Sequence, residues 1–272
     1  MQHKKIVFIG AGNMAFAIIS GLIKSGYPAE QIIARNKSNE TRRSQLRAMG
    51  VQVDLSNLDT VTQADVVILA VKPQMMAEVC SEFAQVDFRA KWVISVAAGI
   101  SVARLEQLLP TASNIVRTMP NTPSLIGEGI AGLFAKKSVD QTACQFAEQL
   151  MSAVGKCYWV DTEAEINQII AITGSSPAYF FKFMEAMQEA AIKMGFSEQN
   201  ARYLVQSAAL GAAKMVVENP EVALATLREN VTSKGGTTAQ ALAVFEQREL
   251  NVTVEQAMNA AIKRAEEMEK SL

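Results

Sequence analysis

The sequence predicts two domains: an α/β domain with a doubly wound parallel sheet over residues 1–160, and an all-helical domain over residues 161–272. Three observations lead to this prediction. Short apolar runs alternate with helical patterns in the first part, which is typical of parallel sheets that are covered on both faces. A glycine-rich turn follows the first of these runs. After residue 160 the strand patterns stop, and Ala and Met recur at helical spacing.

The expected elements of the first domain follow in chain order. The strands share a short apolar pattern and lie at 4–9, 31–34, 51–53, 66–71, 91–97, 114–119, 130–134 and 157–160. The helices between them lie at 11–25, 40–49 and 101–108. Residues 6–23 resemble a signal peptide or a membrane span, but they contain Gly10, Gly12 and Gly21. A strand, a turn and a helix explain them better.

The second domain is predicted to consist of helices with defined ends. Phe180, Phe183 and Met187 recur at helical spacing in a helix that has Pro177 in its first turn and ends at Gly195. The next helix is capped by residue 197, runs to about residue 218 and is rich in small residues. These are Ala208, Ala209, Gly211, Ala212 and Ala213. Small residues allow helices to approach closely, so they predict either a tightly packed core within one subunit or a helix-exchanging dimer interface. The sequence favours neither.

The composition excludes several classes of protein. The chain has 272 residues, of which 49% are hydrophobic and 19% charged, and its net charge is −1. It can therefore build a core, and it offers no electrostatic reason to bind nucleic acid or an anionic membrane. Cys80, Cys144 and Cys157 are widely spaced, which argues against a disulfide framework or a zinc site and fits a reducing cytoplasm. The single histidine, His3, excludes a His-centred triad and a His-rich metal site, so we expect no metal.

The glycine-rich turn has the sequence pattern of a dinucleotide site. It reads Gly10-Ala11-Gly12-Asn13-Met14-Ala15, directly after a predicted strand and at the start of a helix. Gly10 allows the tight turn, Gly12 lets the backbone approach a pyrophosphate, and Ala15 permits close packing of the helix on the sheet. The amino end of the helix offers unpaired N–H groups to the phosphates. The first domain is therefore predicted to be Rossmann-like, with Gly10 to Met14 in contact with the cofactor.

The end of the second strand indicates which dinucleotide binds. NAD sites place Asp or Glu roughly 20 residues after the glycines, where the carboxylate binds the ribose 2′-hydroxyl. This chain has Arg35, Asn36, Lys37 and Ser38 there, which can pair with a 2′-phosphate. We therefore predict that NADP(H) is preferred and that NAD(H) is the second cofactor. The competing interpretation is that these residues form a solvated loop.

Later strand ends are expected to line the same cleft, because ligands bind beyond the carboxyl ends of parallel strands. One end is Ala70-Val71-Lys72-Pro73 and another is Ala97-Ala98-Gly99. Asn57 is expected to reach the adenosine side. Lys72 is interpreted as a solvated or phosphate-facing charge rather than as a catalytic acid.

Four segments together resemble one enzyme family over nearly the whole chain. They are Val71-Lys72-Pro73-Gln74, the segment from Arg117 to Pro123, the segment from Thr173 to Tyr179, and Val231-Thr232-Ser233-Lys234-Gly235-Gly236-Thr237-Thr238. With these segments the chain resembles the pyrroline-5-carboxylate reductase family. The resemblance implies NAD(P)H-dependent reduction of 1-pyrroline-5-carboxylate to L-proline, the last step of proline biosynthesis. It also implies a helical domain that intertwines with a partner subunit, in a homodimer or a ring of dimers.

The resemblance further implies a substrate site near the dimer interface, between the nicotinamide and the loop 233–238. Its residues are Asn230, Ser233, Gly235, Gly236, Thr237 and Thr238, with Glu218 placed more loosely on the imine side. Backbone N–H groups of a Gly-Gly turn at a helix start make a good carboxylate nest. The Thr238 hydroxyl is the expected catalytic group, hydrogen-bonded to the ring nitrogen. Without the resemblance, the loop would be interpreted as a helix N-cap only.

The chain departs from the family pattern at two positions. The family usually has Pro where this chain has Lys234 and Gly where it has Ser176, both in loops beside the expected substrate site.

Three other functions compete with this reductase function. A β-hydroxyacid dehydrogenase would use a lysine of the first long helix, Lys182 or Lys193, as acid and base, but that function leaves the Gly-Gly-Thr-Thr loop unexplained. A ketol-acid reductoisomerase would need a carboxylate cluster for magnesium, and the sequence of the helical half shows none. A dinucleotide-binding sensor without catalytic activity would bind cofactor and turn over no imine.

Overall fold

The computed structural model describes residues 3–37, 39–54 and 58–271, which form two compact units. The first unit ends at Ser175 and also includes the end of the chain from Ala261, and the second unit is Ser176–Ala260. The expected boundary at 160/161 corresponds to the end of the last strand, Gly155–Trp159. The compact units instead divide at Ser175, and the sequence did not indicate that the last helix returns to the first unit.

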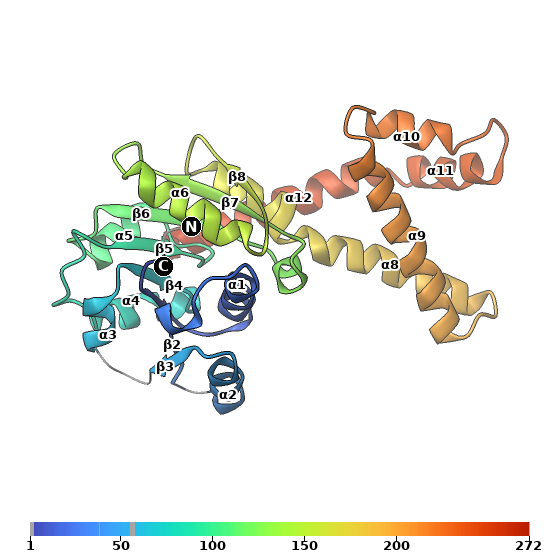
Figure 1. Cartoon of the computed structure of the whole chain (residues 1–272). Coiled ribbons are helices and arrows are strands. Elements are labelled where there is room, and N and C mark those ends of the chain that lie inside the picture. The colour runs from blue at the N-terminus through green and yellow to red at the C-terminus, as the bar shows by residue number, and fades with distance from the viewer. Residues whose placement is uncertain (1–2, 38, 55–57, 272) are drawn as a thin grey trace. The chain divides into compact units, whose positions relative to one another are not determined.

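The first unit is built on a single sheet (Figure 1). Its strands in the described residues are β1 Ile6–Ile9, β2 Ile32–Arg35, β3 Gln52–Asp54, β4 Val66–Leu69, β5 Trp92–Ser95, β6 Asn114–Met119, β7 Gly129–Ala135 and β8 Gly155–Trp159. The order across the sheet is β3-β2-β1-β4-β5-β6-β7-β8. Strands β1 to β6 are parallel, β7 is antiparallel to β6, and β8 is parallel to β7. The antiparallel step follows from a connection between β6 and β7 that contains only a short 3-10 turn, Thr122–Ile126, since a parallel step needs a longer crossover.

Alternate residues of the strands pack under helices on opposite faces of the sheet. Phe8 belongs to the core with α1 Asn13–Lys24, α2 Glu40–Ala48 and α6 Gln141–Ser152. Its neighbour Ile9 belongs to the other core, with α3 Leu58–Gln63, α4 Met76–Ser81 and α5 Val102–Leu108. Each fully buried Ile or Leu contributes about 1.5–3 kcal/mol of hydrophobic free energy. The prediction of a Rossmann-like, doubly wound sheet is confirmed, and residues 6–23 form β1 and α1 as expected.

The rest of the chain is helical, as predicted, and the described residues after β8 form no strand. Its helices are α7 Glu165–Ile169, α8 Ser176–Lys193, α9 Glu198–Glu218, α10 Leu224–Asn230, α11 Thr237–Gln247 and α12 Leu250–Ser271, with a π-helical turn, Ile170–Gly174, between α7 and α8. Within the described parts of the chain, no helix is both long and apolar enough to span a membrane.

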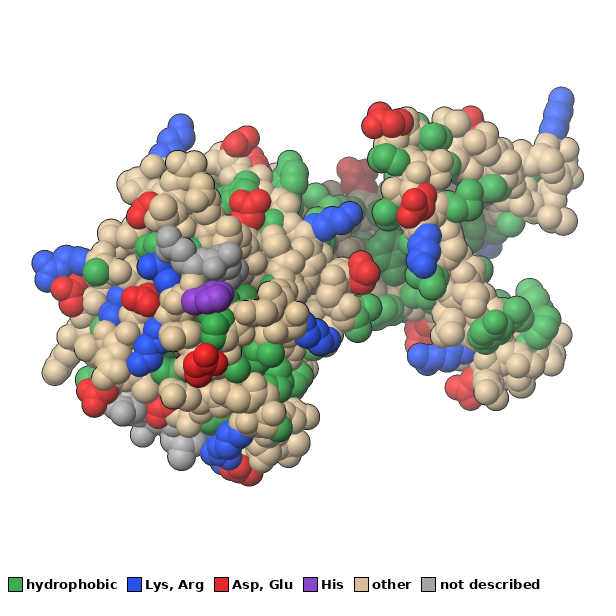
Figure 2. Space-filling model, viewed as in Figure 1, with side chains coloured by type: hydrophobic (Ala, Val, Ile, Leu, Met, Phe, Trp, Pro, Cys, Tyr) green, Lys and Arg blue, Asp and Glu red, His purple; other side chains and the backbone are tan. Residues whose placement is uncertain are grey.

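The second unit buries little of its own apolar surface. The buried residues of α9 are Ala201 and Val205. Large hydrophobic side chains lie at the surface of this unit, where Figure 2 shows them gathered. The small residues Ala208 and Gly211 are exposed, so a core within one chain is wrong for this segment. Apolar faces of this extent mark interaction surfaces.

Candidate active site

A pocket of about 430 Å³ lies at the carboxyl ends of β1, β2 and β4. The strand register aligns Ile9 with Arg35 and with Leu69, so the residues that follow these positions meet at one edge of the sheet. The predicted cofactor residues among those that line the pocket are Gly10, Ala11, Gly12, Arg35, Asn36, Lys37, Ala70, Val71 and Lys72. Here β1 separates the two halves of the sheet, which is where doubly wound folds bind ligands.

The remaining predicted cofactor residues are not counted among those that line this pocket. Within the described residues, these are Asn13, Met14, Pro73, Ala97, Ala98 and Gly99. Asn57 lies outside the described residues. Gly99 is buried in the turn after β5 with a φ of +72°, and the Ala97 N–H donates to Ser95 Oγ at 3.3 Å. A contact of this turn with the cofactor stays a prediction.

The two glycines of the turn differ in what surrounds them. Gly10 has a φ of +97°, and a Cβ atom there would lie 2.5 Å from the carbonyl oxygen of Ala70. Its N–H donates to the carbonyl of Arg35 at 3.1 Å, so the turn is fixed between two strands. A Cβ atom on Gly12 would meet no protein atom within 4 Å, and its backbone is extended. The protein itself therefore needs glycine at Gly10, whereas the open space at Gly12 is a cradle that fits a pyrophosphate at the start of α1.

The cationic end of the pocket holds Arg35 and Lys37 beside Glu82. The side chain of Arg35 is 5% exposed, and its Nη2 atom lies 2.5 Å from Glu82 Oε2. Lys37 Nζ lies 2.8 Å from Glu82 Oε1. Hydrogen bonds from Lys37 and Arg35 lower the pKa of Glu82, so this carboxylate is ionised at neutral pH. The interpretation of Arg35 as a solvated loop residue is wrong, because its side chain is buried.

The loop after β2 is held in place by α2. The Asn39 side chain caps this helix by accepting from the Arg42 N–H at 2.9 Å. Arg43 donates to the carbonyls of Asn36 and Lys37, at 3.1 Å and 3.0 Å. The Asn13 side chain accepts a hydrogen bond from Arg42 Nη2 at 2.8 Å, which connects the glycine turn to the same helix. The backbone beside the predicted 2′-phosphate position is therefore fixed.

Sequence reasoning missed part of this pocket. Met75, Glu78, Val79 and Glu82 also line it, and they come from α4 and its flanking residues. No local pattern marks them, because only the packing of α4 on the sheet brings them to the end of β2.

The predicted substrate residues lie around the start of α11 in the second unit. Gly235 has a φ of +72°, and the Gly236 N–H donates to the Ser233 carbonyl at 3.0 Å. Gly236 is the N-cap of α11, and no side chain caps this helix end. Exposed Thr237 and Thr238 follow in the first turn, and the Thr238 hydroxyl has no hydrogen-bond partner within the described residues. The helix end thus offers amide donors and a positive dipole end to a carboxylate.

Two further predicted residues end helices of the same unit. Glu218 is the last residue of α9 and Asn230 is the last residue of α10, and both are exposed. Lys234, one of the departures from the family pattern, is also exposed. The contacts of these residues with a substrate stay predictions.

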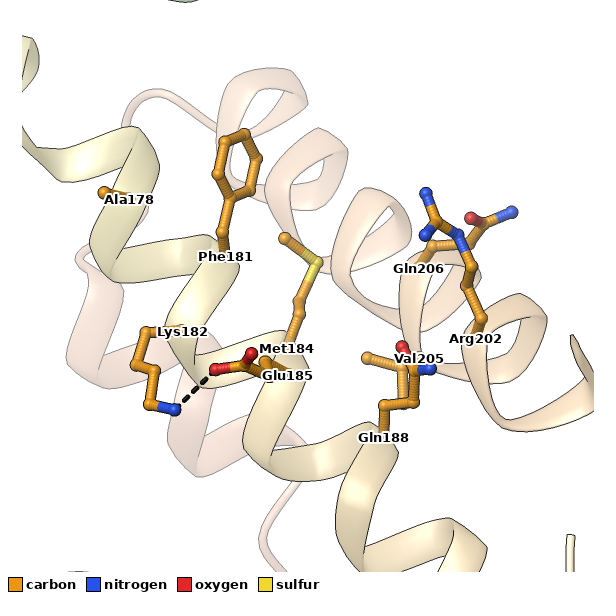
Figure 3. A pocket seen from close by; sticks show the side chains of 9 residues that line it. All are labelled: Ala178, Phe181, Lys182, Met184, Glu185, Gln188, Arg202, Val205 and Gln206. Carbon is orange, nitrogen blue, oxygen red and sulfur yellow. Dashed lines mark hydrogen bonds and ion pairs between the residues drawn. The ribbon is translucent and has the colours of Figure 1, made fainter. Parts of the chain in front are cut away.

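A second pocket, of about 720 Å³, lies between α8 and α9 (Figure 3). It contains Lys182, one of the lysines that a β-hydroxyacid dehydrogenase would use as acid and base. Lys182 is 73% exposed and pairs with Glu185, and the hydrogen bond to Glu185 raises its pKa. A general base needs a pKa near the working pH, so this environment is wrong for that role. Among the described residues, no group of three or more His, Cys, Asp or Glu is arranged to hold a metal ion.

Comparison with known proteins places the chain among its relatives. Residues 163–268 match the family described as "pyrroline-5-carboxylate reductase dimerisation". Residues 5–99 match the family described as "NADP oxidoreductase coenzyme F420-dependent". The pyrroline-5-carboxylate reductase of Haemophilus influenzae is 58% identical over 269 residues, which is 99% of each chain.

Solved structures agree with the sequence relatives. The pyrroline-5-carboxylate reductase of Coxiella burnetii has a TM-score of 0.91 at 42% identity and covers 98% of this chain and 99% of its own. The pyrroline carboxylate reductase of Plasmodium falciparum, with NADP bound, has a TM-score of 0.88 at 27% identity and covers 99% of both chains. The chain belongs to the pyrroline-5-carboxylate reductase family.

Proposed function

We propose that the chain reduces 1-pyrroline-5-carboxylate to L-proline, the last step of proline biosynthesis, with NADPH as the preferred cofactor and NADH as the second. The observation that carries the choice of cofactor is the pocket in which the open Gly12 cradle lies beside Arg35 and Lys37. The substrate identity is supported by the full-length similarity to reductases of this name. When bound, NADPH supplies the hydride that adds to the carbon of the C=N bond. The electron pair of that bond moves to nitrogen, which takes up one proton.

In this proposal the first unit positions the cofactor. Amides from Gly10 to Met14 at the start of α1 hold the pyrophosphate. Arg35, Asn36 and Lys37 hold the 2′-phosphate, and the segments 70–73 and 97–99 follow the rest of the cofactor. These residues orient the cofactor and exclude water from one side of it. Such orientation can lower the activation barrier by about 7–11 kcal/mol in favourable cases.

The second unit is proposed to hold the substrate. The amides of Gly235 and Gly236, with Ser233, Thr237 and Asn230 around them, bind the carboxylate of the substrate, and Glu218 lies toward the imine side. The Thr238 hydroxyl hydrogen-bonds the ring nitrogen and stabilises the charge that changes there during hydride addition.

The assembly is proposed to be a homodimer or a ring of dimers, formed through the helical unit. Its exposed Phe180, Phe181 and Met194 support this, as does the match to a dimerisation family. We propose a cytoplasmic location, which the three free cysteines support.

The test of the function is oxidation of NADPH in the presence of pyrroline-5-carboxylate, with proline identified as the product. We expect rapid turnover, with a higher kcat/KM for NADPH than for NADH. Comparable kcat/KM values for the two cofactors would contradict the cofactor preference. Cofactor binding without turnover of any cyclic imine or 3-hydroxyacid would instead identify a dinucleotide sensor.

Thr238→Ala is expected to lower kcat by about ten- to a hundredfold, the loss of one or two hydrogen-bond increments in the transition state. Thr238 is exposed, so the variant should fold with an unchanged thermal midpoint. Steady-state kinetics check this, with Thr238→Ser, which keeps the hydroxyl, as the matched control. If alanine and serine variants turn over equally fast, Thr238 has no part in the mechanism.

A further inference from the structure

Glu82 lies between the two cations that are assigned to the 2′-phosphate. Its Oε2 atom pairs with Arg35 Nη2 at 2.5 Å, and its Oε1 atom pairs with Lys37 Nζ at 2.8 Å. We propose that Glu82 is a specificity-determining residue, which competes with the 2′-phosphate for Arg35 and Lys37 and thereby keeps NADH usable beside NADPH. This inference rests on the proposed function, since it concerns the cofactor preference of the same pocket.

The contacts around Arg35 leave its guanidinium little freedom to turn toward a new partner. The side chain is 5% exposed, and its Cζ atom lies over the ring of Phe83 at 5.0 Å from the centroid. Its Nε atom is buried and has no hydrogen-bond partner among the described residues. A 2′-phosphate that binds Arg35 must therefore lie next to the Glu82 carboxylate or displace it.

Charge decides which cofactor this arrangement favours. Arg35 and Lys37 carry two positive charges, and Glu82 cancels one of them. A phosphate monoester brings about −1.5 to −2 charges at neutral pH, so the carboxylate opposes its binding. The ribose of NADH has an uncharged 2′-hydroxyl there, which the carboxylate does not repel. A glutamine amide oxygen can accept from this hydroxyl as the carboxylate can, so the binding of NADH does not depend on the charge of Glu82. Glu82 thus weakens the binding of NADPH and leaves that of NADH intact.

The helix that carries Glu82 does not account for this carboxylate. Glu82 is the C-cap of α4, where the helix dipole disfavours a negative charge. Its favourable partners are Arg35 and Lys37, which lie at the end of a strand far away in the sequence. The position of the carboxylate is therefore explained by the pocket and not by local helix stability.

The test is equilibrium binding of two pairs of probes by isothermal titration calorimetry, with the wild-type protein and Glu82→Gln. The first pair is NADPH and NADH, and the second is 2′-phospho-ADP-ribose and ADP-ribose, which lack the nicotinamide. In Glu82→Gln we expect the Kd of the two 2′-phosphorylated probes, NADPH and 2′-phospho-ADP-ribose, to fall by about five- to tenfold. The Kd of NADH and of ADP-ribose should change by less than about twofold.

Glu78→Gln is the matched control. Glu78 lines the same pocket from the same helix, and its replacement by glutamine removes the same charge as Glu82→Gln. Among the described residues, neither Arg35 nor Lys37 pairs with Glu78. We expect the Kd of the 2′-phosphorylated probes to fall by only about two- to threefold, from the general charge of the pocket, because Glu78 holds neither cation. Glu82→Asp, which keeps the charge and shortens the reach, should give intermediate values and serves as the second variant if the glutamine variant does not fold.

Several results would overturn the inference. One is unchanged or weaker binding of NADPH to Glu82→Gln, which would make Glu82 an anchor for Arg35 instead of a competitor. Another is an equal effect in Glu78→Gln, which would reduce the effect to general pocket charge. A wild-type protein that binds neither NADPH nor 2′-phospho-ADP-ribose contradicts both the inference and the proposed cofactor. A wild-type protein that binds both of these probes but turns over no imine contradicts the proposed reaction alone.

Discussion

Gly10→Ala is expected to lower the free energy of unfolding of the first unit by about 2–5 kcal/mol and to abolish NADPH binding. A non-glycine residue is strained at a φ of +97°, and its Cβ atom would lie 2.5 Å from the Ala70 carbonyl oxygen and 2.8 Å from the Ala70 carbonyl carbon. Ala70 cannot move away freely, because its own N–H donates to the Ile9 carbonyl at 2.8 Å. Urea unfolding followed by tryptophan fluorescence measures the loss, since Trp92 and Trp159 both lie in the first unit.

Gly12→Ala is the matched control for this variant. Its Cβ atom would meet no protein atom within 4 Å, and its φ of −68° suits alanine. The free energy of unfolding should therefore change by less than about 1 kcal/mol. The affinity for NADPH should still fall by about ten- to a hundredfold, because the methyl group fills the space where the pyrophosphate approaches. Wild-type affinity in Gly12→Ala, or equal destabilisation by both substitutions, would refute the roles given to these glycines.

Arg117→Met is expected to destabilise the first unit by about 2–4 kcal/mol, because it leaves carboxylates without their cation. The Arg117 side chain is 1% exposed, and its Nη1 atom lies 2.9 Å from Glu163 Oε1 and 2.6 Å from Glu269 Oε1. Glu163 also accepts from the Val102 N–H at 2.7 Å, and Glu269 accepts from Asn167 Nδ2 at 3.1 Å. Arg117 therefore joins β6 to the starts of α5 and α7 and to the end of α12.

The expected loss is smaller than for a fully buried ion pair, since the Glu163 and Glu269 side chains are 25% and 23% exposed. Arg264→Met provides the comparison, because Arg264 forms an ion pair on the same helix, α12, but is 70% exposed. It should change the free energy of unfolding by less than about 0.5 kcal/mol. Adding Glu269→Gln to Arg117→Met should restore about 1 kcal/mol by removing one uncompensated charge. Equal midpoints of Arg117→Met and Arg264→Met in urea would show that the buried cluster does not hold α12.

Many elements could be predicted because local interactions form them. The apolar run of β1 is buried on both faces and is followed by the glycine turn, so strand, turn and helix start all lie within a few consecutive residues. Ser197 caps α9 by accepting from the Asn200 N–H at 3.3 Å, a contact over three positions. The cofactor pocket was predictable for a related reason, because the ends of parallel strands meet at one edge of the sheet.

The substrate site was predicted in a different way. Helix patterns place Gly235 and Gly236 before α11, but they do not distinguish a binding loop from a plain helix start. The resemblance to a known family supplied that distinction, and the roles of Glu218 and Thr238 stay predictions.

The sequence by itself therefore determined the Rossmann-like sheet, the helical second half and the residues of the glycine turn. Only the tertiary structure decided that α12 returns to the first unit through Glu269, that β7 runs antiparallel, and that Glu82 pairs with Arg35. These features join groups far apart in the sequence, and Glu82 lies 47 positions from Arg35. The period of a helix or a strand reports which face of an element is buried, but it does not report which distant charge will lie opposite that face, because the packing of whole elements sets that distance.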